Sequence, residues 1–184
     1  MPTTEVTTAG GGPASKRPFV VAHVAVSLDG ATVGFPADIA RFYKLIRTWH
    51  EDVTLTGADT VLAQETAMRE GDHPGPARDG PLLAVVDSRA RVHEWEALRT
   101  AGYWSDVVAL GAEATPERFE PVDEIVGGVD RVDLAAALDT LARRGARVVR
   151  VDSGGALIGA LLHDGLVDEV SLLVHPSLTG HPER

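Results

Sequence analysis

Short apolar runs alternate along this chain with stretches whose apolar residues recur at helical spacing. Runs of strand length occupy residues 19–26, 52–55, 82–86, 107–110, 125–126 and 148–151. Helical spacing occupies residues 39–49, 61–65, 95–101 and 132–144, and residues 71–81, rich in Gly and Pro, are typical of a loop. Strands that alternate with helices in this way predict an α/β fold whose central sheet is mostly parallel.

The stretch 147–176 carries the strongest local signal, because it predicts a strand, a glycine turn, a helix and another strand in that order. Three valines between residues 148 and 151 form the strand, and the sequence DSGG at 152–155 ends it where the helix begins. Free N–H groups and the dipole at a helix N-terminus attract anions, and glycine lets a phosphate approach the backbone. We therefore expect a phosphate-bearing ligand here. The alternative is an ordinary small-residue turn in which Ser153 caps the helix.

Four predicted turns follow directly after strands. They are residues 27–30, 56–60, 87–91 and 152–156. In parallel α/β sheets, ligands bind beyond the carboxyl ends of the strands, so these turns form the candidate site. Ser88, Arg89 and Arg91 offer a hydroxyl and two guanidinium groups, which suit a phosphate monoester such as the 2′-phosphate of NADP. A solvated surface would explain the same arginines.

Two further patterns have an ordinary structural interpretation. The predicted helix at 39–49 follows Asp38 as a cap, and its apolar residues are expected to face the core. Those residues are Ile39, Phe42, Leu45, Ile46 and Trp49. His23 lies within an apolar strand, and we expect it to be a hydrogen-bonded core residue rather than a ligand.

Composition narrows the range of functions. The chain has 184 residues, which favours one domain, and contains no apolar run near the about 20 residues of a membrane span. Its net charge of −10 argues against a nucleic-acid partner, whose phosphates need clustered Lys and Arg. The absence of cysteine excludes disulfides, iron–sulfur clusters and thiolate zinc sites, and with them a zinc deaminase. The seven histidines include no pair at a spacing of four residues, so we expect no metal site.

The opening residues 1–16 are rich in Thr, Gly and Ala and lack the apolar segment of a signal peptide. We expect them to form a disordered tail ahead of one domain at 17–184. A cytoplasmic location is the corresponding expectation.

Five stretches, taken in order, resemble the reductase domain of riboflavin biosynthesis, a family with a dihydrofolate-reductase-like fold. They are RPFV with AVSLDG (17–20 and 25–30), LTGADTVLA (55–63), VVDSR (85–89), VDSGGAL (151–157) and GLVDE (165–169), the last leading to Pro176 and Gly180. The resemblance implies a three-layer α/β sandwich that reduces a small molecule, a ribosylaminopyrimidine phosphate, with NADPH. It also implies a homodimer.

The resemblance further implies roles for individual residues. Asp29 is the expected catalytic residue, beside the substrate ring. The expected cofactor-binding residues are Thr56, Gly57, Thr60, Ser88, Arg89, Arg91, Ser153, Gly154, Gly155, Ala156 and Leu157. The expected substrate-binding residues are Ser27, Asp29, Arg69 and Asp152. Hydride delivery mainly needs the nicotinamide held against an electrophilic carbon, which fits a chain without a pattern for strong acid–base catalysis.

The chain departs from the family's usual pattern in several places. Asp152-Ser153-Gly154 stands where the family usually has Glu-Gly-Gly, and residues 64–69 match its acidic-Pro segment poorly. The sequence ends at Arg184, before the family's terminal hairpin, and the loop at 30–38 is short. Two alternatives therefore stay open: a reductase of another heterocycle or carbonyl, and a nucleotide-binding module of the same fold without turnover.

Overall fold

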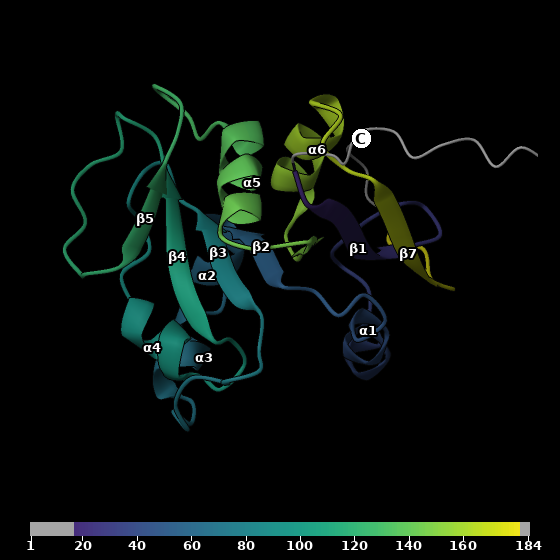
Figure 1. Ribbon diagram of the computed structural model, residues 1–184. Coiled ribbons are helices and arrows are strands. Elements are labelled where there is room, and N and C mark those ends of the chain that lie inside the picture. Colours follow the sequence, from purple (N-terminus) through teal and green to yellow (C-terminus); the bar gives the residue numbers. More distant parts are fainter. Residues whose placement is uncertain (1–16, 181–184) are drawn as a thin grey trace, which may run out of the picture.

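One seven-stranded sheet, parallel at every pair of neighbouring strands, organises residues 17–180, the part of the chain that this computed structural model describes (Figure 1). The strands are β1 (Phe19–Ser27), β2 (Val53–Gly57), β3 (Leu82–Val86), β4 (Asp106–Gly111), β5 (Asp123–Val126), β6 (Val148–Val151) and β7 (Glu169–His175). The helices are α1 (Ile39–Ile46), α2 (Ala58–Leu62), α3 (Glu65–Glu70), α4 (Trp95–Thr100), α5 (Leu134–Arg143) and α6 (Gly155–His163). The predicted α/β fold with a mostly parallel sheet is confirmed. The tail predicted at 1–16 lies outside the described residues.

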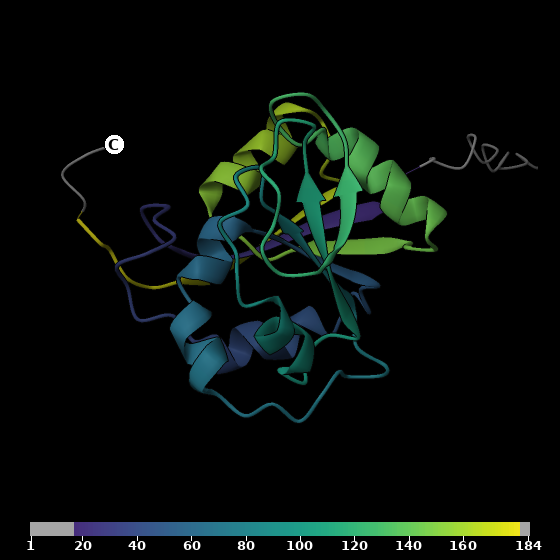
Figure 2. The same ribbon diagram turned by 90° about the vertical axis from the view of Figure 1, so that its left-hand side faces the viewer.

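Helices cover both faces of the sheet, which gives the three layers that the resemblance implied (Figure 2). Helices α5 and α6 lie on one face, where Leu138 and Leu161 pack against strand residues such as Leu55. Helices α1 to α4 lie on the other face, where Trp95 and Leu98 of α4 belong to a second buried cluster. The sheet is therefore buried on both sides over most of its width, as parallel sheets require.

The order of the strands, β5-β4-β3-β2-β6-β1-β7, places the late strand β6 between β2 and β1. Leu55 of β2 is paired with Val151 of β6, and the Asp152 N–H donates to the Leu55 carbonyl oxygen at 2.9 Å. Strands β2 and β6 therefore end side by side. The chain then enters α2 on one face and α6 on the other, so a crevice opens between the two turns.

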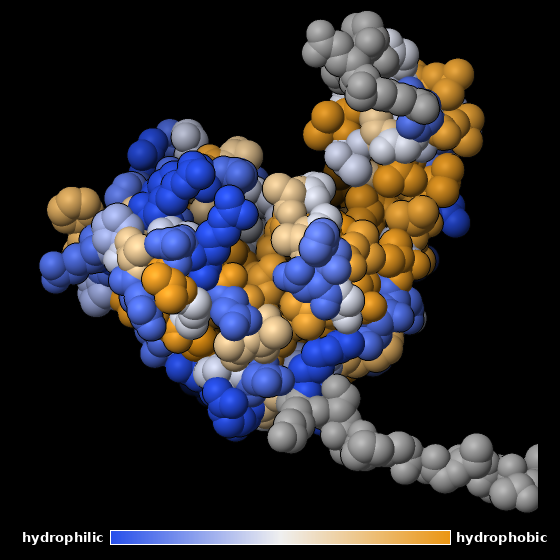
Figure 3. All heavy atoms as spheres, turned by 90° about the horizontal axis from the view of Figure 1, so that it is seen from above, coloured by the Kyte–Doolittle hydropathy of each residue, from blue (hydrophilic) through white to orange (hydrophobic). Residues whose placement is uncertain are grey.

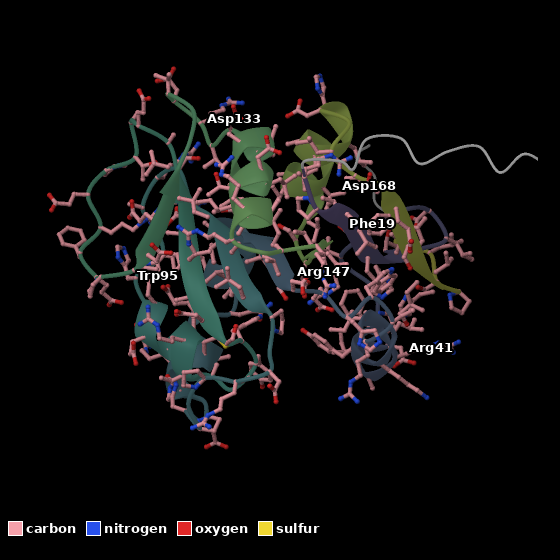
Figure 4. All side chains as sticks on the ribbon, in the orientation of Figure 1. Phe19, Arg41, Trp95, Asp133, Arg147 and Asp168 are labelled. Atoms are coloured by element: carbon pink, nitrogen blue, oxygen red, sulfur yellow. The ribbon has the colours of Figure 1, made fainter. Side chains whose placement is uncertain are left out.

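Helix α5 shows how local signals set the limits of an element. The Asp133 side chain accepts a hydrogen bond from the Ala136 N–H at 2.9 Å and caps the first turn (Figure 4). Gly145 follows the helix with a φ of +104°, a left-handed conformation that favours glycine. The helix predicted at 132–144 is shorter by the residues that form these ends.

Helix α1 corrects one prediction, because none of its residues is buried and the expected core-facing stripe does not form. Ile39 is 57% exposed, and Phe42 is only partly buried. The helix also ends at Ile46, before Trp49. Helical spacing identifies an apolar face but not what covers it. Here Phe42 stacks on His23, and Ile46 borders a cavity described below.

His23 lies under this helix and confirms its predicted role as a core residue. Its ring stacks on Phe42 at 4.4 Å between centroids, and its Nδ1 lies 3.1 Å from the Ser171 Oγ. Burial is the main cause that lowers the pKa of His23, so the neutral imidazole is favoured.

A buried ion pair braces the loop after β3. The Asp87 carboxylate accepts the backbone N–H groups of Arg91 and Val92, each at 3.1 Å, and an Arg118 Nη1 donor at 2.7 Å. The Arg118 guanidinium also lies 5.4 Å from the ring centroid of Trp95. Burial alone would raise the pKa of Asp87, but the two backbone hydrogen bonds and Arg118 outweigh it and lower the pKa.

We expect Asp87→Asn to lower the free energy of unfolding by about 3 kcal/mol near neutral pH, because Arg118 loses its fully buried counter-charge and keeps only the partly exposed Glu124. Ionised Asp87 contributes fully to the free energy of unfolding above the pKa of an unfolded aspartate, about 4. This contribution is lost as the pH falls through the lower pKa of Asp87 in the folded protein. Urea unfolding at neutral and acidic pH measures both effects. The control Asp123→Asn, whose ion pair with Arg144 is exposed, should cost less than about 1 kcal/mol. A loss for Asp87→Asn that does not change with pH contradicts the prediction.

Candidate functional site

A cavity of about 520 Å³ lies over the turns that follow β2, β3 and β6, and we call it the turn cavity. Its lining includes every predicted cofactor-binding residue except Thr56. These are Gly57, Thr60, Ser88, Arg89, Arg91, Ser153, Gly154, Gly155, Ala156 and Leu157. Residues from three strand ends, predicted separately along the chain, are therefore brought together in one place.

Hydrogen bonds from side chains join the turns after β2 and β6. The Ser153 Oγ accepts the Gly57 N–H at 3.2 Å and lies 3.3 Å from the Thr60 Oγ1. The Thr56 Oγ1 donates to the Asp152 carbonyl oxygen at 2.6 Å. The two turns therefore hold one another in position.

The start of α6 is open to the cavity. Gly154, rather than Ser153, is the N-cap residue, and no side chain of the described chain caps this end. A Cβ added at Gly154 or Gly155 would meet no atom within 4 Å. Because the first N–H groups of a helix lack partners within it, this end can receive an anionic group. The alternative interpretation of Ser153 as an ordinary helix cap is wrong, since its hydroxyl is bound to the neighbouring turn.

Three arginine side chains line the turn cavity, together with the carboxylates of Asp59 and Asp130. Arg89 and Arg91 line it as predicted, and Arg91 forms an ion pair with Asp59 at 2.7 Å. Arg131, which sequence reasoning missed, joins them from the loop between β5 and α5. That loop turns at Gly128, which has a φ of +86° and whose added Cβ would lie 2.1 Å from the Arg131 carbonyl oxygen. The loop also follows a strand, so the rule that identified the other turns would have found it.

A second cavity, of about 620 Å³, lies against the sheet face that α1 to α4 cover, and we call it the face cavity. It is lined by Tyr43, Ile46, Arg47, Glu51, Thr54, Thr56, Thr60, Val61, Gln64, Met68, Pro81, Leu83, Leu98, Tyr103, Trp104, Arg150 and Asp152. Thr60 lines both cavities, so they adjoin. Thr56 and the predicted substrate residue Asp152 lie in the face cavity.

A buried guanidinium forms part of the floor of the face cavity. The side chain of Arg150 is 4% exposed and donates to Glu51 at 2.8 Å and to Asp152 at 2.9 Å. Burial opposes its charge, but the two carboxylates outweigh burial and raise the pKa of Arg150. A single arginine within a run of valines is the sequence signal for this cluster.

Three predicted site residues line neither cavity. Arg69 is 56% exposed and lies 3.6 Å from Glu94 in an ion pair. The Asp29 carboxylate accepts hydrogen bonds from the Ser27 Oγ at 2.5 Å and the Thr179 Oγ1 at 2.9 Å. These hydrogen bonds lower the pKa of Asp29, Ser27 contributing most. Asp29 and Ser27 thus join the loop after β1 to the segment after β7, apart from the two cavity linings.

Residues 17–180 contain no cluster of His, Asp or Glu side chains that could hold a metal ion. No helix within the same residues is long and apolar enough to cross a membrane.

The all-parallel sheet, its two helical layers and the crevice at the ends of β2 and β6 define a dihydrofolate-reductase-like α/β protein. More specifically, the chain belongs to the RibD C-terminal domain family, which matches residues 18–184.

Two archaeal relatives match nearly full length. The 2,5-diamino-6-ribosylamino-4(3H)-pyrimidinone 5′-phosphate reductase of Archaeoglobus fulgidus is 32% identical over 89% of this chain and 83% of its own. The reductase of the same name from Methanothermobacter thermautotrophicus is 31% identical over 89% of this chain and 80% of its own.

Solved structures support the same fold. The riboflavin biosynthesis reductase Rib7 of Saccharomyces cerevisiae superposes with a TM-score of 0.69 at 21% identity, over 92% of this chain and 78% of that one. RibD of Acinetobacter baumannii superposes with a TM-score of 0.66 at 24% identity, over 93% of this chain and 49% of that one.

Proposed function

We propose that this protein is an NADPH-dependent reductase of a ribosylaminopyrimidine phosphate. The observation that carries the proposal is that the turn cavity and the face cavity adjoin at Thr60. A dinucleotide in the first cavity would bring its nicotinamide end to a heterocycle in the second. The names of the two archaeal relatives support this substrate class.

The turn cavity suits a phosphorylated dinucleotide. The open N-terminus of α6, at Gly154 and Gly155, would receive the pyrophosphate through backbone N–H groups. Ser88, Arg89 and Arg131 would bind the 2′-phosphate by hydrogen bonds and charge. Gly57 and Thr60, at the boundary between the cavities, would contact the nicotinamide ribose.

The face cavity suits an aminopyrimidine that carries a phosphate. The Asp152 carboxylate would accept N–H groups of the ring, and the side chains of Tyr43, Tyr103 and Trp104 offer aromatic surface. Arg47 lines the same cavity and forms no ion pair within residues 17–180, so it is available for the substrate phosphate. A phosphate role for Arg69 and a catalytic role for Asp29 stay predictions from the sequence.

Positioning is what this chain's residues would contribute to the reaction. When bound, NADPH supplies the hydride that converts the C1′ imine of the opened ribose to a ribitylamine, and the imine nitrogen gains a proton. Asp152 would fix the ring, and the turns after β2 and β6 would fix the dinucleotide, so that the two reacting carbons meet. The buried walls of the face cavity would limit access of water.

A homodimer is the form that we propose in solution. On β7, Val170, Leu172 and Val174 are each about half exposed and lie in register with Ala22, Val24 and Val26 of β1. Their side of the sheet continues the apolar face that α6 covers (Figure 3). Such a contiguous apolar surface supports association with a second copy. A cytoplasmic location stays a prediction.

We expect the purified protein to oxidise NADPH in equal amount to the ribosylaminopyrimidine phosphate supplied. Loss of absorbance at the nicotinamide band measures the reaction, and chromatography identifies the ribitylamine product. Omission of the pyrimidine is the control for uncoupled oxidation. Tight NADPH binding in calorimetry without turnover would instead favour the non-catalytic module.

We also expect the protein to prefer NADPH to NADH, because Ser88, Arg89 and Arg131 would bind the 2′-phosphate, which NADH lacks. The double variant Ser88→Ala/Arg89→Ala should reduce that preference by about tenfold or more, with little change in NADH affinity. Calorimetric titration of both cofactors into both proteins measures the preference. Equal affinity of the unmodified protein for NADPH and NADH contradicts this prediction.

Arg47 and Arg69 can be distinguished by substrate kinetics. Arg47→Ala should raise the KM for the pyrimidine phosphate by about tenfold or more, because a charge-assisted hydrogen bond to the phosphate is lost. Arg69→Ala, a change at the exposed pair with Glu94, should leave KM within about twofold. The reverse result would restore the role that the sequence predicted for Arg69.

A further inference from the structure

Arg150 is a buried charge in an otherwise apolar strand. It lies between Val149 and Val151 in the middle of the sheet, and its side chain is 4% exposed. Replacing a buried ion pair by apolar residues is often neutral or stabilising, so folding alone does not require an arginine here. This residue therefore needs another explanation.

The partners of Arg150 suggest that explanation. Its Nε donates to Glu51, which is 10% exposed, and its Nη2 lies 3.4 Å from the Thr54 Oγ1. Its Nη1 donates at 2.9 Å to the Oδ2 of Asp152, a side chain that is 31% exposed. Of the two carboxylates, Asp152 is thus the more open to the face cavity. Glu51 and Thr54 hold the guanidinium on its other side.

The geometry fixes which oxygen of Asp152 a ligand could use. Residues at i and i+2 of an extended strand lie on the same face, so Arg150 and Asp152 meet without a change in the backbone. With Oδ2 bound to Arg150, Oδ1 accepts no hydrogen bond from the described residues. The guanidinium is a rigid planar fork, and Glu51 restricts its rotation. One carboxylate oxygen is therefore held fixed while the other is left for a ligand.

We propose that Arg150 is a positioning residue, which holds Asp152 so that its free oxygen receives an N–H group of the substrate ring. This inference rests on the proposed function of the face cavity. It also explains how an aspartate can act where the resembling family usually has a longer glutamate, because a shorter side chain reaches less far and must be directed. Arg150 itself does not contact the reacting atoms.

The test compares substrate affinity in four proteins: unmodified, Arg150→Met, Asp152→Asn and the double variant. Calorimetric titration of the ribosylaminopyrimidine phosphate in the presence of NADP⁺ measures binding without turnover. We expect Arg150→Met to weaken substrate binding by about tenfold or more, and NADP⁺ binding by less than about twofold. In the Asp152→Asn background, Arg150→Met should have little further effect, because the residue that it positions is already altered.

Two further variants separate positioning from stability. Arg150→Lys keeps the positive charge but lacks the planar set of N–H donors, so it should restore only part of the substrate affinity. If the Met variant does not fold, the Lys variant takes its place in the test. Arg99→Met, which breaks a remote pair with Asp106, should bind substrate like the unmodified protein.

Normal substrate affinity in folded Arg150→Met overturns the inference, as does an equal loss in both Asp152 backgrounds. Normal affinity in Arg150→Lys overturns it when the Met variant does not fold. The proposed function fails separately, if the unmodified protein does not oxidise NADPH with this substrate.

Discussion

The parallel pairing of β2 with β6 is the constraint on which the candidate site depends. It brings together turns that are 96 residues apart, and the bonds from Thr56 to Asp152 and from Gly57 to Ser153 lock them. Because the chain leaves β2 and β6 toward opposite faces of the sheet, the crevice between the turns cannot be closed by either helix. Both cavities border this crevice, and the surrounding helices complete their walls.

Two buried arginines hold carboxylate side chains at strand ends, which the backbone pairing of the strands does not fix. Arg118 binds Asp87 at the end of β3, and Arg150 binds Asp152 at the end of β6. In each case a strand-end carboxylate is held by a guanidinium of low exposure, which resists the rotation that a solvated aspartate would have. Both oxygens of the Asp87 carboxylate accept hydrogen bonds from the backbone of its own loop. In Asp152, only Oδ2 is bound, and Oδ1 is left for a ligand. The first arrangement shapes a loop, and the second can present a ligand-binding group.

Local patterns predicted most of the elements, although the helix expected at 61–65 is divided into α2 and α3. They also predicted most of the turn cavity, because the ends of neighbouring parallel strands share one edge of the sheet. The rule that ligands bind beyond the carboxyl ends of parallel strands does not say which strand ends border the same crevice. The loop after β1 is separated from β2 by β6, so Asp29 binds Thr179 rather than joining Gly57. Arg150 was missed because its partner Glu51 is 99 residues away, a contact that no local periodicity records. Likewise, the spacing in α1 showed an apolar face but could not show that none of its residues would be buried.

Asp152-Ser153-Gly154 differs from the Glu-Gly-Gly usual in the family, but the difference does not block the N-terminus of α6. Ser153 uses its hydroxyl on the neighbouring turn, so the added side chain stays out of the path to Gly154 and Gly155. The shorter carboxylate of Asp152 is matched by a guanidinium on the same strand face. These contacts leave the N-terminus of α6 open and keep Asp152 bound to Arg150 in spite of the substitutions.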